Sequence, residues 1–172
     1  MIELELTFLA RHFPAGLEKC ESREIVDIYF PEKKAHPTIR LRKNGKKFEL
    51  TKKEPLAEGN SSEMLEQTIM LREEEFLEFA RLPGKKVSKI RHNYPFNGLV
   101  AEVDVFTEAL EGLVLVDFEF SSIEEKAAFK IPEFCLAEVT QEAFVAGGML
   151  CGKSFKDIEQ ALEKFGYKSL KL

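Results

Sequence analysis

The 172-residue sequence has no tryptophan, only three cysteines and no hydrophobic run long enough to cross a membrane. Cys20, Cys135 and Cys151 are far apart and form no Cys-x-x-Cys pair, so neither a zinc site of that pattern nor a disulfide framework is indicated. A bilayer-spanning helix needs about 20 consecutive apolar residues. Glu3 and Glu5 are incompatible with the apolar core of a signal peptide. These absences predict a protein with reduced thiols, located in the cytoplasm and not bound to membranes.

The sequence also lacks the basic excess that is typical of proteins that bind nucleic acids. It has 30 acidic and 25 basic residues, for a net charge of −5, although 32% of all residues are charged. A nucleic-acid-binding domain normally concentrates a surplus of Lys and Arg on one face. We therefore expect no nucleic-acid partner, and a single domain over residues 1–172, whose oligomeric state the sequence does not predict.

Alternating apolar and polar residues dominate the chain and predict β-strands. The strongest signal is Asn44-Gly45 between two alternating segments at 38–43 and 46–53, which is typical of a β-hairpin. Further strands are expected at 2–9, 24–30, 63–72, 87–94, 99–106 and 114–120. Eight strands without βαβ spacing predict an α+β, mainly β fold, built as a closed or nearly closed antiparallel β-barrel.

Helical periodicity is confined to three segments, at 73–82, 122–129 and 154–165. Ser122 with Glu125, and Ser154 with Asp157, have the spacing of helix N-terminal capping pairs. Residues 54–62 are polar and predict a loop. We expect a barrel over about 2–140, a C-terminal helical segment over about 141–172, and helices packed outside the barrel.

Five predicted strands carry a pair of like charges on one face and apolar residues on the other, because residues two apart on a strand share a face. These pairs are Glu3 with Glu5, Arg40 with Arg42, Lys89 with Arg91, Glu102 with Asp104, and Asp117 with Glu119. An ordinary half-exposed sheet explains any single pair. If the sheet closes, however, the charges line a lumen with six carboxylates at one place and cations at another. Such a lumen suits a hard cation such as Mg²⁺ or Mn²⁺ together with a polyanion.

The same residues resemble the CYTH superfamily, also called the triphosphate tunnel metalloenzymes. The resemblance is carried by the N-terminal IELE, by IRLRKNGKKFELTKK, by KVSKIRH, and by AEVDVF followed by LVDFEF. It covers about residues 2–140. It implies a closed eight-stranded tunnel, in which cations grip the triphosphate of a small molecule and carboxylates hold one or two divalent metal ions.

The resemblance also implies roles for individual residues. Tyr29 corresponds to a tyrosine found in part of the family and is the candidate catalytic residue. The implied substrate-binding residues are Arg40, Arg42, Lys52, Lys89 and Arg91. The implied ligands of Mg²⁺ or Mn²⁺ are Glu3, Glu5, Glu102, Asp104, Asp117 and Glu119.

Two departures from the family pattern leave three functions open. Thr7 stands where the opening Glu-x-Glu-x-Lys motif has lysine, and Gly147 and Gly148 follow Val139-Thr140 where the family has a polar pattern. A hydroxyl cannot supply the positive charge of the lysine. The expected function is metal-dependent hydrolysis of an inorganic or nucleoside triphosphate. The alternatives are a catalytically impaired protein that binds polyphosphate or nucleotide, and an adenylate cyclase of class IV type.

Overall fold

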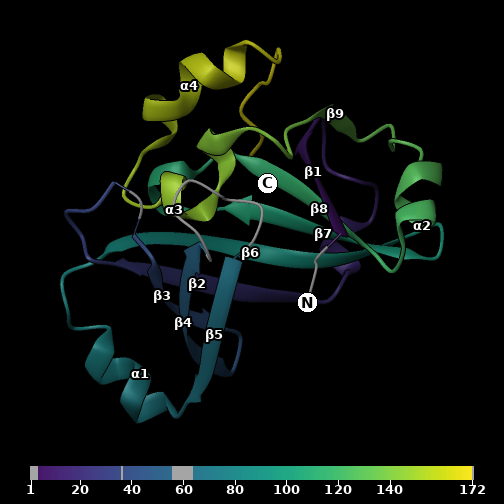
Figure 1. Cartoon of the computed structure of the whole chain (residues 1–172). Coiled ribbons are helices and arrows are strands. Elements are labelled where there is room, and N and C mark those ends of the chain that lie inside the picture. Colours follow the sequence, from purple (N-terminus) through teal and green to yellow (C-terminus); the bar gives the residue numbers. More distant parts are fainter. Residues whose placement is uncertain (1–3, 36, 56–63, 172) are drawn as a thin grey trace.

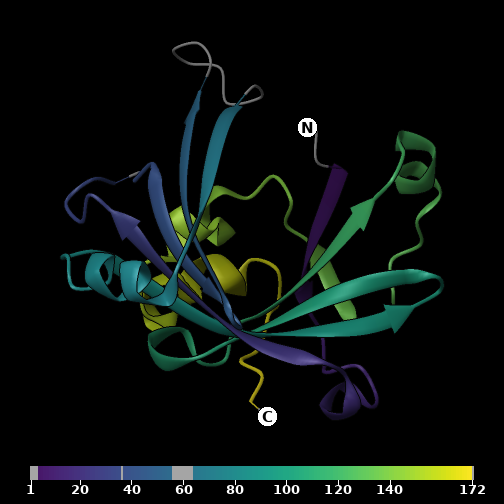
Figure 2. The same ribbon diagram turned by 90° about the horizontal axis from the view of Figure 1, so that it is seen from below.

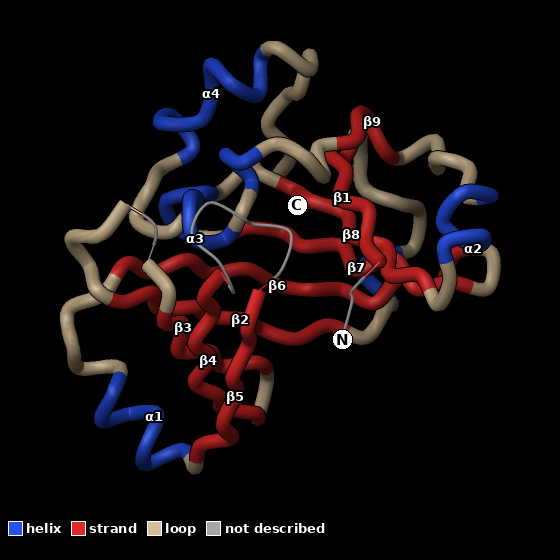
Figure 3. Tube along the Cα trace, in the orientation of Figure 1, coloured by secondary structure: helices blue, strands red, loops and turns tan. Residues whose placement is uncertain are grey.

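The computed structural model describes residues 4–35, 37–55 and 64–171. The strands are β1 (Leu4–Ala10), β2 (Ser22–Phe30), β3 (Ile39–Asn44), β4 (Lys47–Pro55), β5 (Met64–Leu71), β6 (Lys85–Phe96), β7 (Leu99–Phe106), β8 (Val114–Phe120) and β9 (Cys135–Glu138). The helices are α1 (Glu73–Phe79), α2 (Ile123–Ala128), α3 (Gly147–Leu150) and α4 (Phe155–Glu163), with short 3₁₀ turns η1 (Leu17–Lys19), η2 (Glu108–Leu110) and η3 (Ala143–Val145). Figure 3 separates these elements by type.

The strands form one antiparallel sheet of nine strands in the order β5-β4-β3-β2-β6-β7-β8-β1-β9 (Figure 1). The antiparallel, mainly β fold is confirmed, and every predicted strand is present. The predicted closure of the barrel is not confirmed, because within the described residues β5 and β9 are the two edges of the sheet. One of these edges is the unpredicted strand β9, which pairs with β1 over Phe8–Ala10. The sheet is therefore an open trough (Figure 2).

Two tight turns show how glycine sets the hairpins. Between β3 and β4 the register pairs Asn44 with Lys47, so the turn centres on Gly45 and Lys46, one residue later than the predicted Asn44-Gly45. Gly45 has a φ of 58°, a conformation that glycine adopts without steric cost. Between β6 and β7, both Asn97 and Gly98 have positive φ, at 47° and 82°. The second hairpin thus has the conformation that Asn-Gly favours.

The convex face of the trough packs against phenylalanines near α2. Phe8 and Phe118 are fully buried, and their ring centroids lie 6.1 Å apart in an edge-on arrangement. Phe129, which follows α2, packs against both, with its centroid 4.6 Å from that of Phe118. The predicted cap of α2 is also present, since the Ser122 hydroxyl accepts a hydrogen bond from the backbone N–H of Glu125. α2 therefore lies outside the sheet, as expected.

The C-terminal segment, by contrast, covers the concave face at one end. Leu150 of α3 and Leu162 of α4 are buried in one cluster with Leu9, Val87 and other concave residues. The expectation that all helices pack outside is thus wrong for η3 and α3, because the concave face is apolar at this end and must be covered. Within the described part of the chain, no helix has both the length and the apolar character to cross a membrane.

Candidate functional site

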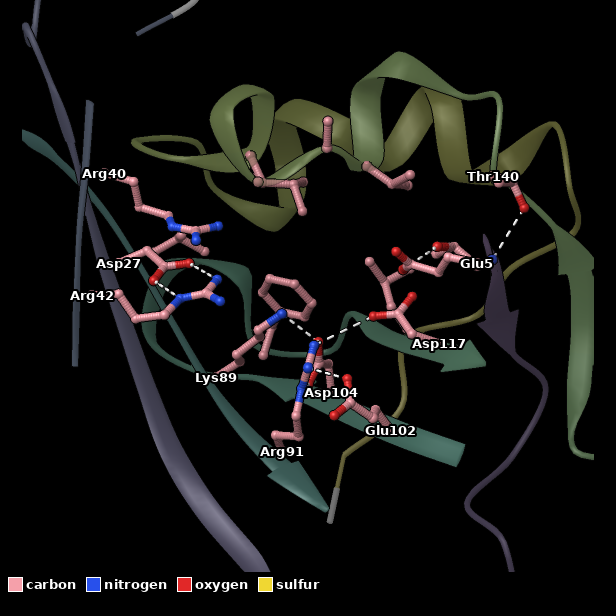
Figure 4. Close-up of a pocket in the computed structure, with 18 of the residues that line it drawn as sticks. Glu5, Asp27, Arg40, Arg42, Lys89, Arg91, Glu102, Asp104, Asp117 and Thr140 are labelled. Carbon is pink, nitrogen blue, oxygen red and sulfur yellow. Dashed lines mark hydrogen bonds and ion pairs between the residues drawn. The ribbon is translucent and has the colours of Figure 1, made fainter. Parts of the chain in front are cut away.

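A cavity of about 480 Å³ lies on the concave face, between the sheet and the segment η3–α3. Its charged lining residues are Glu5, Asp27, Arg40, Arg42, Lys89, Arg91, Glu102, Asp104, Asp117, Glu119 and Glu142. Figure 4 shows most of these side chains pointing into the same space. We call this space the concave cavity. It brings together all the residues that the sequence predicted for the site except Glu3 and Lys52.

These two exceptions have different reasons. Glu3 lies outside the described residues. Lys52 is paired in register with Ile39, whereas Arg40 is paired with Thr51. Paired residues of an antiparallel ladder share a face, so Lys52 lies on the face opposite Arg40, and it does not line the concave cavity. The structure therefore does not bring Lys52 to the other predicted substrate-binding residues.

A compact group of ion pairs, which we call the central cluster, joins Lys89, Arg91, Glu102 and Asp104. The Arg91 guanidinium donates from Nε to Asp104 Oδ1 at 2.6 Å and from Nη2 to Oδ2 at 2.7 Å. Arg91 also donates to Glu102, and Lys89 donates to Asp104. Burial by itself would raise the pKa of Asp104, which is fully buried, but the positive charges of Lys89 and Arg91 outweigh it and lower that pKa.

We expected the carboxylates at one place in the cavity and the cations at another. In the central cluster they lie side by side instead. Glu102 and Asp104 accept hydrogen bonds from Arg91, so their charges are compensated by neighbouring cations. Among the residues that the structure describes, no three His, Cys, Asp or Glu side chains are close enough to hold a metal ion. The six predicted ligands therefore do not form one preassembled metal site in the described part of the chain.

Three other carboxylates, those of Glu5, Asp117 and Glu119, lie along β1 and β8, and we call them the acidic wall. Glu5 is paired in register with Glu119, and Thr7 with Asp117. The hydroxyl of Thr7 donates to Glu5 at 3.3 Å. Asp117 has one ion pair with Arg91, at 3.4 Å, yet burial and the negative charges of Asp104 and Glu5 raise its pKa to about 7. Closely spaced carboxylates of this kind favour a bound cation.

At the other side of the concave cavity, β3 carries Arg40 and Arg42. Arg42 makes a bidentate ion pair with Asp27 of β2, through Nε to Oδ1 at 2.6 Å and Nη2 to Oδ2 at 2.7 Å. The ion pair of Arg40 with Glu49 is longer, at 3.8 Å. The Nε of Arg40 is buried and has no hydrogen-bond partner within the described residues. Arg40 lines the cavity, so its guanidinium group as a whole is available to a bound anion.

Tyr29 borders the concave cavity beneath α3. It is paired in register with Arg40 and is buried, and burial raises its pKa to about 12. The phenol therefore keeps its proton at neutral pH and can donate a hydrogen bond, but it cannot act as a base. A Cβ added to Gly147 would come within 2.5 Å of the Tyr29 hydroxyl oxygen, so glycine permits this close approach.

Sequence reasoning missed Asp27, Thr140 and Glu142, which also line the concave cavity. Asp27 had a usable signal, because it lies two residues before Tyr29 and therefore on the same face of the strand. Thr140 accepts a hydrogen bond from the backbone N–H of Thr7, 133 residues away in sequence. No local pattern could reveal that contact.

The antiparallel sheet and the interleaved acidic and basic side chains of its concave face agree with the resemblance to the triphosphate tunnel class, although the sheet is open within the described residues. No protein-family model matches the sequence. The inorganic triphosphatase of Nitrosomonas europaea is 31% identical over 144 residues, which cover 83% of this chain and 91% of that protein. The inorganic triphosphatase of Acetivibrio thermocellus is 31% identical over 74 residues, 43% of this chain and 46% of that protein.

A solved structure leads to the same class. The crystal structure of the inorganic triphosphatase NE1496 is similar with a TM-score of 0.68 and 25% identity, over 89% of this chain and 96% of that one. The chain belongs to the CYTH, or triphosphate tunnel, superfamily, as its sequence motifs predicted.

Proposed function

We propose that the protein hydrolyses a triphosphate in the concave cavity, with inorganic triphosphate as the first substrate to test. The observation that carries the proposal is the convergence of four cations, Arg40, Arg42, Lys89 and Arg91, on a cavity of about 480 Å³ that also contains carboxylates. Both curated relatives described above are inorganic triphosphatases. The proposed partner is thus a small molecule with a triphosphate group, and a cytoplasmic location stays a prediction from the sequence.

The cations divide into two pairs with different tasks. Arg40 and Arg42 bind phosphate oxygens, because a guanidinium presents several N–H donors in a geometry that matches phosphate. Lys89 and Arg91 lie on β6, and their positive charges stabilise negative charge that develops on the transferred phosphoryl group. Asp104 holds both of these cations by ion pairs.

The acidic wall is the part of the cavity where a divalent metal ion would bind, and its side chains would have to move closer together around the ion, because they do not form a preassembled site among the described residues. Its donors, from Glu5, Asp117 and Glu119, are the oxygen ligands that Mg²⁺ and Mn²⁺ prefer. Burial, and then the negative charges of Asp104 and Glu5, raise the pKa of Asp117 to about 7, so a bound cation would favour its deprotonated form. A bound Mg²⁺ or Mn²⁺ would polarise a phosphoryl oxygen and help to neutralise the substrate. Glu102 and Asp104 instead hold Arg91, and the prediction for Glu3 is retained as a further ligand of the wall.

Tyr29 acts as a hydrogen-bond donor rather than as a base in this proposal. Its pKa of about 12 keeps the phenol protonated. The hydroxyl lies at the α3 end of the concave cavity and can donate to a terminal phosphate or to the leaving group.

Phosphate release from inorganic triphosphate, with Mg²⁺ and with Mn²⁺, tests the proposal. We expect metal-dependent release of phosphate. No release above background with either metal would contradict hydrolysis. The same assay with ATP distinguishes the cyclase alternative, because a cyclase forms cyclic AMP and pyrophosphate, whereas a hydrolase forms phosphate.

A binding protein without turnover is the alternative that one observation favours. Thr7 faces Asp117 across β1 and β8, at the position where the family motif has a lysine. Calorimetric binding of triphosphate without hydrolysis would support this alternative. The variant Thr7→Lys then becomes informative, because restored turnover would show that only the missing cation prevents catalysis. The variant Thr7→Val serves as the control without a charge.

A further inference from the structure

Asp27 is a charged residue in the middle of an otherwise apolar part of β2. It follows Val26 and precedes Ile28, and only 3% of its surface is exposed. Its carboxylate lines the concave cavity. Because a buried carboxylate is costly unless it is paired, the reason for an aspartate here must lie in its partner.

That partner is Arg42, which is paired in register with Asp27 across β2 and β3. Both carboxylate oxygens are used, at 2.6 Å and 2.7 Å, and they engage Nε and Nη2 of the guanidinium. A bidentate pair fixes the plane of the guanidinium. The donors of Nη1 are not engaged by Asp27 and stay available on the cavity side for a phosphate.

Arg40 provides the internal contrast, two residues earlier on the same face of β3. Its carboxylate neighbour, Glu49, is 3.8 Å away and makes no fork with it. Arg40 is therefore held loosely, while Arg42 is held in one orientation. An arginine that is already oriented loses less side-chain entropy when it binds an anion.

We propose that Asp27 is a positioning residue, which fixes Arg42 in the orientation that binds the triphosphate and acts on the substrate only through Arg42. The proposal rests on the proposed triphosphatase function. It predicts that Asp27 contributes nothing to triphosphate binding once Arg42 is gone. A carboxylate that repelled the substrate or held a metal ion would keep its effect.

The test is a double-mutant cycle with Asp27→Asn, Arg42→Ala and the combined variant. The readouts are kcat and KM for inorganic triphosphate and the calorimetric Kd for triphosphate. We expect Asp27→Asn to lower kcat/KM about 10- to 100-fold, as is usual for a residue that orients a ligand-binding group. We also expect the combined variant to match Arg42→Ala to within about twofold.

The matched control is Glu24→Gln. Glu24 also pairs β2 with β3, through Lys43 at 2.7 Å, but on the convex face. The variant Glu24→Gln should leave kcat/KM unchanged. If Glu24→Gln lowered activity as much as Asp27→Asn, the effect would come from strand pairing, and the proposal would be wrong.

A second route covers the case in which Asp27→Asn does not fold. Arg42→Lys keeps the positive charge but cannot form the fork, so it should lower kcat/KM by a similar factor. Multiplicative losses in the double-mutant cycle, or tighter triphosphate binding by Asp27→Asn, would overturn the proposal. If the wild-type protein binds triphosphate without turnover, the cycle is read on Kd alone. If it neither binds nor hydrolyses triphosphate, the proposed function fails first and the role of Asp27 fails with it.

Discussion

The two strands that bear the cavity's cations, β3 and β6, hold them in different ways. On β6, Lys89 and Arg91 share the fully buried Asp104, and Arg91 also pairs with Glu102 and Asp117. On β3, Arg42 has a close carboxylate in Asp27 (Figure 4). Arg40 has only the carboxylate of Glu49, at 3.8 Å.

The difference between β3 and β6 separates charged groups that stabilise the fold from charged groups that are available to bind a ligand. In the central cluster the carboxylates match the cations in number, so these ion pairs largely compensate one another. On β3 each arginine has one carboxylate partner, but that of Arg40 is 3.8 Å away, which leaves the charge of Arg40 less compensated and more available for a polyanion. The acidic wall on the far side of the cavity provides carboxylate oxygens that could bind a cation. A metal-bound triphosphate is complementary to both sides at once.

The largest expected effect is that of Asp104→Ala on stability. This variant leaves two partly buried cations without the buried carboxylate that they share, and removing one partner of a buried ion pair costs up to about 3–5 kcal/mol. Denaturant unfolding measures the change in the free energy of unfolding. Asp104→Asn, which retains a hydrogen-bond acceptor, should cost less. A loss below about 1 kcal/mol in Asp104→Ala would mean that the central cluster is not structural.

Arg40→Ala should instead affect activity and leave stability almost unchanged. Hydrogen bonds to charged groups contribute about 1.5–3 kcal/mol, so kcat/KM for triphosphate should fall about 10- to 100-fold. The free energy of unfolding should change by less than about 1 kcal/mol, because the partner Glu49 is 3.8 Å away. Arg40→Lys is the control that keeps the charge. Equal stability losses in Arg40→Ala and Asp104→Ala would contradict the distinction between the cations of β3 and those of β6.

The acidic wall predicts a pH dependence. The pKa of Asp117 is raised to about 7 in the folded protein, from 3.8, by burial and by Asp104 and Glu5. The folded state therefore binds more protons than the unfolded state between these values, and the free energy of unfolding falls as the pH rises from about 4 to about 7. Asp117→Asn should remove this slope, which unfolding curves at pH 5 and pH 8 would measure.

The same group links metal binding to pH. A metal ligand must be deprotonated, so the affinity for Mn²⁺ should increase about tenfold between pH 6 and pH 8, as follows from one group with a pKa of about 7. Calorimetric titration with Mn²⁺ checks this. An affinity independent of pH, or a pH dependence that persists in Asp117→Asn, would exclude Asp117 as the titrating group.

The last expected effect concerns the contact of β2 and α3 beside Arg40. A Cβ at Gly147 would lie 2.5 Å from the Tyr29 hydroxyl oxygen, so Gly147→Ala should cost about 1–3 kcal/mol by overpacking. Gly148→Ala is the matched control, since its Cβ would lie 3.9 Å from Tyr29, an ordinary contact. Thermal unfolding compares the two variants. Equal melting temperatures would show that Tyr29 moves away freely.

Local patterns in the sequence predict much of the fold. Alternation places all eight predicted strands and puts Arg40 and Arg42 on one face, because strand parity depends only on neighbouring residues. The caps at Ser122 and Ser154 mark the starts of α2 and α4 for the same reason. The short strand β9 is missed, since four residues carry too little pattern. The edge of the sheet that β9 forms is therefore missed as well.

The pairing of charges in the site is not predictable from parity. Parity places Glu102 and Asp104 on the same face as the other predicted metal ligands. It does not show that their strand, β7, lies next to the strand that carries Arg91. Arg91 and Asp104 lie only 13 residues apart, on the two strands of the β6–β7 hairpin, and their pairing depends on the register that the turn at Asn97 and Gly98 sets. Lys52 is a different case, because a one-residue shift in a strand motif moves a side chain to the other face.

The most direct test of the whole account is a crystal structure with Mn²⁺ and a non-hydrolysable imido analogue of triphosphate. The account predicts the anomalous signal of Mn²⁺ among the oxygens of Glu5, Asp117 and Glu119, and phosphate oxygens on the guanidinium groups of Arg40 and Arg42. It also predicts that Asp104 still holds Arg91. Manganese bound between Glu102 and Asp104 with Arg91 displaced, or phosphates outside the concave cavity, would contradict the account.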